Sequence, residues 1–227
     1  MSDKVIDQWN QAAETYAVEQ EKSSFADANK AVVKSRFCEL SGEKVLDLGC
    51  GYGSYTDYFR SIGGSATGVD GAKSMIDLAK EKYPDCEFEV VDITKKLPFD
   101  EGSFDIVFCN QVLMDIENVE DVLSEVARVL KKGGIFYWSI VHPAFFTGDW
   151  VEGDPSGKLV TSYITPTVTE NRFWGETTHY HRPLSFYLNA CSDAGLLLVH
   201  TEEPKAYDGV SKNADIPLFF FAEYRKG

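Results

Sequence analysis

Apolar positions near the start of the chain recur at the spacing of an amphipathic helix. They follow one another at steps of three or four residues and so share one helical face. These residues are Ile6, Trp9, Ala13 and Tyr16. A second run of the same kind covers roughly residues 25–40. The pattern predicts a helical cap over residues 1–40.

Short apolar runs then alternate with amphipathic segments up to residue 141. The predicted strands are 44–48, 66–69, 87–91, 104–108 and 135–141, and the predicted helices are 54–62, 74–82 and 119–130. Asn118 is a candidate cap for the last of these helices, and Lys131-Lys132 would lie in its final turn. Alternation of this kind is typical of an α/β protein with a parallel, doubly wound sheet.

The alternation stops after His142-Pro143. Residues 144–183 are aromatic and rich in threonine, and they show no helical period. Alternating polarity predicts a small β-meander whose strands are 159–164, 167–173 and 176–181. A helix over 185–194 and strands over 196–200 and 218–224 then complete the fold. We therefore expect one domain over residues 1–227, with a substrate-covering insertion at the sheet edge where such folds bind ligands.

Composition narrows the range of partners and compartments. The 227 residues include 22 Lys and Arg against 36 Asp and Glu, a net charge of −14, which disfavours nucleic acid and anionic membrane surfaces. The 5 cysteines are scattered without a Cys-x-x-Cys pair, so neither a disulfide framework nor a metal site is expected. No segment has transmembrane or signal-peptide character, so a cytoplasmic location is predicted, while the oligomeric state stays open.

Polar residues follow four successive predicted strands. The first strand leads into a glycine-rich turn, residues 49–53, where backbone N–H groups can approach an anionic group closely. Asp70 ends the second strand, where a carboxylate can accept both hydroxyls of a ribose. Asp92-Ile93 ends the third strand and suits the amino group and face of an adenine. Asn110 ends the fourth strand, so all four groups should face one crevice.

These motifs resemble those of class I S-adenosylmethionine-dependent methyltransferases of the small-molecule type. Segment 45–53 (VLDLGCGYG) looks like the family's first motif, and segments 68–70 (GVD), 91–93 (VDI) and 104–107 (FDIV) match later motifs in order. The resemblance covers residues 40–142 closely. It implies a Rossmann-like seven-stranded sheet with the last strand antiparallel.

The resemblance also implies a set of residues around the cofactor S-adenosylmethionine and its product S-adenosylhomocysteine. By the family pattern, Asp70 and the following Gly71 hold the ribose, and Asp92 meets the adenine amino group. The methionine end is closed by Tyr16. The residues that line the methionine moiety are Asp47, Gly49, Cys50, Gly51 and Asn110, and those that flank the adenine are Met75 and Ile93.

Four histidines are candidates for moving a proton during methyl transfer. His142 follows the fifth strand at the ligand edge, and His181 lies at the end of the insertion, so these two are the predicted catalytic residues. His179 shares a strand face with His181 but is a weaker candidate. His200 lies within a terminal strand and away from the crevice.

The predicted function is transfer of a methyl group to O or N of a small aromatic or heteroaromatic metabolite. The aromatic insertion would form a wall for such an acceptor. The sequence after Asn110 is Gln111-Val112-Leu113 and lacks the motif of enzymes that methylate nucleic-acid bases. A non-catalytic sensor or pseudoenzyme that binds the same cofactor is the alternative. An NAD-dependent oxidoreductase is disfavoured because Ser54 replaces the third glycine of that motif.

Overall fold

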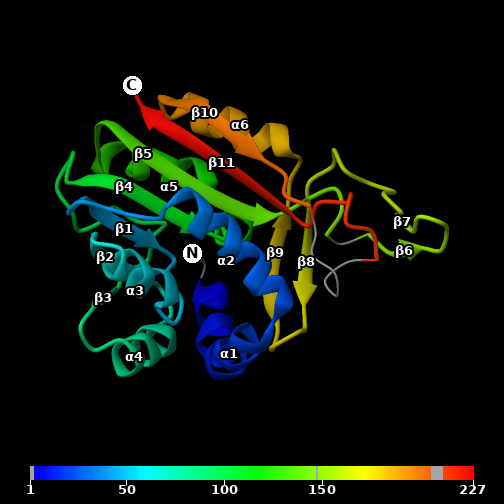
Figure 1. Cartoon of the computed structure of the whole chain (residues 1–227), viewed down its shortest axis with the longest axis horizontal. Helices are drawn as coiled ribbons and strands as arrows, with labels where there is room; N and C mark the ends of the chain where they lie inside the picture. Colours follow the sequence, from blue (N-terminus) through cyan, green and yellow to red (C-terminus); the bar gives the residue numbers. More distant parts are fainter. Residues whose placement is uncertain (1–2, 147, 206–211) are drawn as a thin grey trace.

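The computed structural model describes residues 3–146, 148–205 and 212–227. Its centre is a seven-stranded sheet in the order β10-β11-β5-β4-β1-β2-β3 (Figure 1). The strands are β1 (Lys44–Leu48), β2 (Ser65–Asp70), β3 (Glu87–Val90), β4 (Phe104–Asn110), β5 (Leu130–Val141), β10 (Leu196–Glu202) and β11 (Phe219–Lys226). Strands β1 to β5 pair in parallel, whereas β11 is antiparallel to both β5 and β10. The predicted α/β fold with an antiparallel last strand is therefore confirmed.

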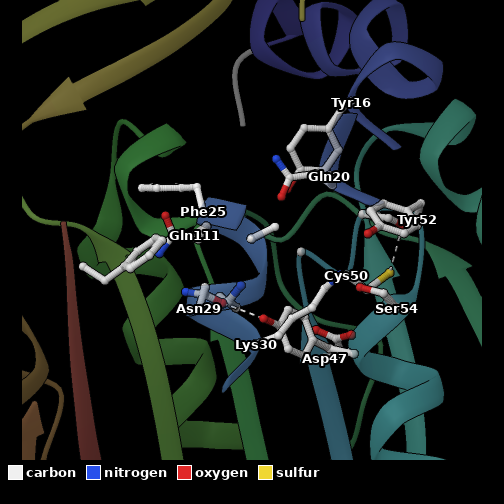
Figure 2. Close-up of a pocket in the computed structure, with 16 residues that line it drawn as sticks. Tyr16, Gln20, Phe25, Asn29, Lys30, Asp47, Cys50, Tyr52, Ser54 and Gln111 are labelled. Carbon is white, nitrogen blue, oxygen red and sulfur yellow. Dashed lines mark hydrogen bonds between the residues drawn. The ribbon is translucent and has the colours of Figure 1, made fainter. Parts of the chain in front are cut away.

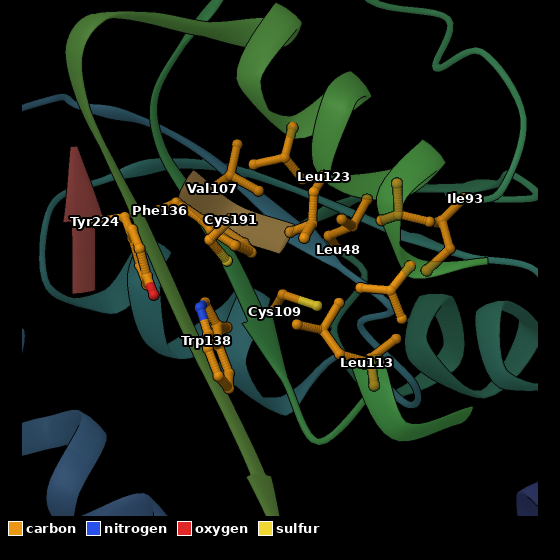
Figure 3. Packing of buried hydrophobic residues seen from close by; sticks show 14 of the residues in the cluster. Leu48, Ile93, Val107, Cys109, Leu113, Leu123, Phe136, Trp138, Cys191 and Tyr224 are labelled. Atoms are coloured by element: carbon orange, nitrogen blue, oxygen red, sulfur yellow. The ribbon is translucent and has the colours of Figure 1, made fainter. Parts of the chain in front are cut away.

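Helices cover both faces of the sheet because its central strands are apolar on both sides. Along β4, Ile106 and Phe108 pack with α2 (Ser24–Arg36) and α3 (Ser54–Ser61). The alternate residues Val107 and Cys109 face the other way and belong to a cluster with α5 (Val119–Val129) and α6 (Leu184–Asp193). Figure 3 shows this second cluster, in which Leu123, Trp138 and Cys191 come from three different elements.

The remaining helices lie along the β2–β3 side of the sheet and over its carboxyl edge. Helix α4 (Lys73–Lys82) packs on β2 and β3, and α1 (Asp3–Lys22) packs on α4. Figure 1 shows α1 beside strand β9 of the insertion. Gln8 of α1 ties the two together, because its Oε1 accepts hydrogen bonds from Thr178 N (3.2 Å) and Thr178 Oγ1 (2.9 Å).

The insertion forms two separate hairpins instead of the predicted three-stranded meander. Strands β6 (Trp150–Val151) and β7 (Gly157–Lys158) pair with each other, and β8 (Thr167–Asn171) pairs with β9 (Thr177–His181). The segment 159–164 is not a strand. Its apolar residues stay outside the core, with Leu159 51% and Ile164 72% exposed. Alternating polarity was therefore not sufficient for a strand here, because no neighbouring strand pairs with this segment in the described structure.

Two helix boundaries also differ from the sequence pattern. Helix α2 ends at Arg36 rather than near residue 40, and α5 ends at Val129. Leu130 already pairs with Phe104 as part of β5, so Lys131 lies in a strand and its Nζ donates to Asp105 at 2.6 Å. Asn118 occupies the N-cap position of α5, but its side chain makes no capping hydrogen bond. None of the helices within the described ranges is both long and apolar enough to cross a membrane.

Candidate functional site

The ends of β1, β2 and β4 meet at one edge of the sheet and border two adjoining cavities. The first lies between the glycine turn and the helices α1 and α2, and Figure 2 shows Asn29 and Gln111 on one side of it and Tyr52 on the other. The second continues toward the end of β2 and is lined by Asp70, Met75 and Asp115. Residues common to both cavities are Tyr16, Gly49, Gly51, Asn110 and Gln111.

The glycine turn lines these cavities, but most of its N–H groups are hydrogen-bonded within the protein, whereas the sequence pattern predicts that they are free for an anionic group. Gly49 has φ +78°, and a Cβ there would meet Val112 Cγ2 at 2.5 Å, so a side chain is excluded by both conformation and space. The N–H groups of Gly49 and Cys50 donate to Val69 O, and Gly51 N donates to Asp70 Oδ2 at 3.0 Å. These bonds fix the turn against β2 and bring Asp70 beside it.

Asp47 and Asp70 are acidic groups held in a poorly hydrated place. Burial raises the pKa of Asp47 to about 7, although Thr56 Oγ1 donates to its Oδ2 at 2.7 Å and opposes the shift. Burial also raises the pKa of Asp70, against hydrogen bonds from the backbone of Ala72 and Gly51. Neither carboxyl has a Lys or Arg partner within the described ranges, so a cation that entered the cavity would stabilise both as carboxylates.

A third buried acid, Asp115, was not identified from the sequence. It ends a short 3-10 helix, η1 (Leu113–Asp115), that follows the end of β4, and its side chain is 4% exposed. Burial raises the pKa of Asp115 well above its usual range, against a hydrogen bond from the Trp9 side chain. No sequence motif marked this residue, because its position depends on the turn at Gln111, which has φ +60°.

A polar network holds Asn110 at the cavity wall. Ser139 Oγ donates to Asn110 Oδ1 at 2.6 Å, and Gln111 Nε2 donates to Ser139 Oγ at 2.9 Å. Asn29 of α2 reaches the same hydroxyl at 3.4 Å. Lys30, also from α2, lines the first cavity and adds a basic group to a largely acidic surface. The network therefore joins the end of β4 to the N-terminal helical cap.

Tyr16 lies at the meeting point of the cavities, within an aromatic cluster. Its ring contacts those of Trp9 (5.3 Å between centroids), Trp174 (5.1 Å) and Tyr52 (6.1 Å), all in edge-to-face arrangements. These partners come from α1, the β8–β9 turn and the glycine turn. The cluster thus closes the crevice from above with side chains of three separate segments.

The residues expected around the adenine are only partly brought together. Met75 is buried and lines the second cavity. Ile93 belongs to the hydrophobic core below the sheet edge, and Asp92 accepts hydrogen bonds from Thr94 N (3.0 Å) and Oγ1 (2.7 Å). Neither they nor Gly71 line the two cavities. Helix α1 covers this side, since Ile6 lies 3.2 Å from where a Gly71 Cβ would be.

A third cavity adjoins the second and is enclosed mainly by aromatic and apolar side chains. It shares Trp9, Tyr16, Gln111 and Asp115 with the second cavity. Its other lining residues are Gln20, Phe25, Met114, Val141, Phe146, Asn171, Phe173, Trp174 and His179. We call this cavity the aromatic chamber. Most of its wall comes from α1, η1 and the insertion, not from the strand-end motifs.

The structure does not bring the two predicted catalytic histidines into the aromatic chamber. His142 is 3% exposed, stacks on Phe145 and lies 2.7 Å from Glu203 Oε1 through its Nε2. Burial lowers the pKa of His142, with Glu203 opposing the shift. His181 Nε2 is hydrogen-bonded to the Tyr163 carbonyl at 2.9 Å and borders a further cavity behind the chamber. The weaker candidate, His179, lines the chamber itself.

Comparison with known proteins assigns the central part of the chain to a family. Residues 46–138 match the family model of a methyltransferase domain. An uncharacterized methyltransferase of Synechocystis is 38% identical over 56% of this chain and 58% of its own length. Demethylmenaquinone methyltransferase of Lactococcus lactis is 35% identical over 48% of this chain and 46% of its own length. The chain thus spans about half the length of these relatives.

The fold agrees with this assignment. A crystal structure of an S-adenosylmethionine-dependent methyltransferase from Mesorhizobium loti superposes with a TM-score of 0.78 at 24% identity, covering 88% of this chain and 98% of that one. Residues 46–138 thus match a methyltransferase domain, and the sheet has the fold of this S-adenosylmethionine-dependent methyltransferase. The family resemblance seen in the sequence motifs is confirmed.

Proposed function

We propose that this protein transfers the methyl group of S-adenosylmethionine to O or N of a small aromatic or heteroaromatic metabolite. One observation carries the proposal. The buried carboxyls of Asp47 and Asp115 and the half-buried carboxyl of Asp70 border one crevice, and none has a Lys or Arg partner within the described part of the chain. Such an acidic crevice favours a ligand with positive charges.

S-adenosylmethionine fits this electrostatic requirement, because it carries an ammonium and a sulfonium as well as a carboxylate. In our proposal Asp47 and Asn110 lie at the ammonium end, and Lys30 is available for the carboxylate. Asp70, beside the glycine turn, accepts the ribose hydroxyls. The bound cofactor supplies a methyl carbon activated by the sulfonium. The protein's own task is to align the acceptor with that carbon and to exclude water.

The aromatic chamber is our candidate for the acceptor site. Its walls favour a flat, apolar molecule, since aromatic side chains offer large faces for stacking and little charge. Two relatives are named demethylmenaquinone methyltransferase and ubiquinone biosynthesis O-methyltransferase, and both names refer to quinones. The net charge of −14 supports a metabolite rather than a nucleic acid as partner.

Cofactor binding and transfer are tested separately. Thermal unfolding with S-adenosylhomocysteine or with NAD should show stabilisation by the former alone, because only a ligand of the native state raises its melting temperature. Incubation with methyl-labelled S-adenosylmethionine and a metabolite extract should then yield a labelled small molecule. Stabilisation without any labelled product would favour a non-catalytic sensor. Stabilisation by NAD instead would contradict the proposal.

A further inference from the structure

We infer that His179 takes the proton from the methyl acceptor and that Asp115 positions it, so the acceptor presents an aromatic O–H or ring N–H. This inference rests on the proposed function, because it assigns roles within the proposed acceptor site. It goes further in naming the chemistry of the acceptor atom. Neither residue is among the catalytic residues predicted from the sequence.

The geometry places the two side chains together at the wall of the aromatic chamber. His179 Nε2 lies 3.3 Å from Asp115 Oδ1, and the two side chains are 13% and 4% exposed. His179 comes from β9 of the insertion and Asp115 from η1, and both line the chamber. Asp115 also lines the neighbouring cofactor cavity. The pair therefore stands between the two proposed binding sites.

The second ring nitrogen of His179 is available to an acceptor. Nε2 lies near Asp115 Oδ1, a buried oxygen that has no hydrogen-bond partner among the described residues, and Nδ1 makes no hydrogen bond there either. In our proposal the imidazole carries its proton on Nε2, the nitrogen near the Asp115 oxygen, and Nδ1 is left as the proton acceptor. This is the arrangement that a general base needs.

The surroundings keep the imidazole neutral before the ligands bind. Burial lowers the pKa of His179 to about 4, so the ring can accept a proton at neutral pH. The titratable groups that interact electrostatically with Asp115 are Tyr16 of α1, Asp70 of β2, Cys109 of β4, Tyr180 of β9 and Tyr187 of α6. A cation in the cofactor cavity would stabilise Asp115 as a carboxylate. That carboxylate in turn would stabilise a proton on His179.

For a phenolic acceptor, the O–H bond breaks and the proton moves to His179 Nδ1. The oxygen lone pair forms the new bond to the methyl carbon, the carbon–sulfur bond breaks, and its electron pair stays on sulfur, which leaves S-adenosylhomocysteine. The imidazolium, facing Asp115, later returns its proton to water. No metal or redox partner enters the step.

The experiment uses 4-nitrophenol as the probe, because its phenolate absorbs visible light and its phenol does not. The full chain is loaded with sinefungin, an S-adenosylmethionine analogue that carries an amine in place of the sulfonium methyl group. The probe is then added at a pH below its own pKa. We expect a phenolate band for the wild-type protein, because the proton has moved to His179, and loss of that band in His179→Gln. Asp115→Asn should weaken the band.

Three further variants separate His179 from the other histidines. His200→Gln is the matched control, since His200 is exposed on β10 and far in the fold from the chamber wall. It should keep the full band. His142→Gln and His181→Gln test the competing assignments. Loss of the band in either of them, with the band kept in His179→Gln, would overturn the inference.

A measurement on the wild-type protein covers the case in which His179→Gln does not fold. With ¹⁵N-labelled histidine, NMR should show one imidazole becoming doubly protonated when 4-nitrophenol joins the sinefungin complex. The spectra of the other three variants should each retain that signal, which assigns it to His179. Its absence from the wild-type spectrum, or its loss in His142→Gln, His181→Gln or His200→Gln, would overturn the inference.

Calorimetry of sinefungin binding distinguishes a failure of the proposed function from a failure of the role assigned to His179. If sinefungin does not bind, the proposed function itself fails. If sinefungin binds but no phenolate forms in the wild-type protein, only the role of His179 and the protic aromatic acceptor are contradicted. Binding of both ligands with phenolate formation that depends on His179 supports the inference.

Discussion

The two cavities at the strand ends, where we propose that the cofactor binds, adjoin the aromatic chamber but are built in a different way. This cofactor side is made mainly from the ends of β1, β2 and β4, with helices α1 and α2 beside them. The chamber is made from α1, η1 and the β8–β9 hairpin, which are far apart in the sequence. A parallel sheet determines where its strand ends meet, whereas separate segments must be brought together by packing.

This difference has a consequence for function. Groups on the cofactor side are held by backbone hydrogen bonds, as in the bond from Gly51 N to Asp70. The chamber depends on side-chain contacts between elements, such as those of Gln8 with Thr178 and His179 with Asp115. Substitutions on the two sides should therefore have separable effects on cofactor binding, on turnover and on stability.

The largest effect should come from the chamber. We expect His179→Gln to lower kcat about 10²-fold or more with a phenolic acceptor, because general base catalysis contributes that much. The dissociation constant for S-adenosylhomocysteine should stay near that of the wild-type protein. Labelled-methyl transfer and calorimetry check the two quantities. A variant that loses cofactor affinity to the same extent would show that the two sides are not separable.

Stability should also depend on pH through the chamber. The pKa of His179 is about 4 in the folded protein against 6.5 for the free side chain. Between these values the unfolded chain binds a proton that the folded chain does not, so stability is full above pH 6.5 and falls toward pH 4. The loss is about 3 kcal/mol. The free energies of unfolding of the wild-type protein and of His179→Gln, measured with urea over this range, should converge as the pH falls.

The wild-type protein must be compared with His179→Gln because Asp115 also makes stability depend on pH. Its raised pKa acts in the opposite direction, because the folded chain holds a proton there that the unfolded chain releases as the pH rises. The difference between wild-type protein and variant isolates the contribution of the histidine. Parallel unfolding curves at every pH would contradict the buried, neutral imidazole.

The cofactor side should respond to Asp70→Ala. We expect binding of S-adenosylhomocysteine to weaken about 10²-fold, because losing a hydrogen-bond acceptor for the ribose hydroxyls costs up to about 3 kcal/mol. Asp77→Ala is the control, since Asp77 lies on the exposed side of α4 in an ion pair with Lys73. Calorimetry should find the control unchanged. Near wild-type affinity in Asp70→Ala would contradict the ribose assignment.

The smallest effect concerns the contact that joins the two sides. Gln8→Ala leaves the N–H and hydroxyl of the buried Thr178 without their acceptor, which should lower the free energy of unfolding by about 2 kcal/mol. Gln11→Ala on the exposed face of α1 is the control and should have no such effect. Denaturant unfolding measures both. An equal loss in the control would indicate a property of the helix rather than of the contact.

The sequence determined the fold and the cofactor side of the crevice. Apolar runs of strand length define β1 to β5, and the side chains that follow them converge because parallel strands end at one edge. Asp47, Gly49, Gly51, Asp70 and Asn110 could be named for this reason, and all five line the cavities. Their position depends mostly on their own strand.

Only the tertiary structure decided how the chamber is assembled. His142 follows β5 as predicted, yet its ring stacks on Phe145 and its Nε2 lies 2.7 Å from Glu203, a residue from a distant part of the chain. His179 and His181 are two residues apart on β9 and so lie on the same face of the strand. Only His179 lines the aromatic chamber, whereas His181 is hydrogen-bonded to the Tyr163 carbonyl. Asp115 and His179 are 64 residues apart in the sequence and meet only because α1 and η1 pack against the insertion. Such contacts between distant segments depend on packing, which no local pattern of residues encodes.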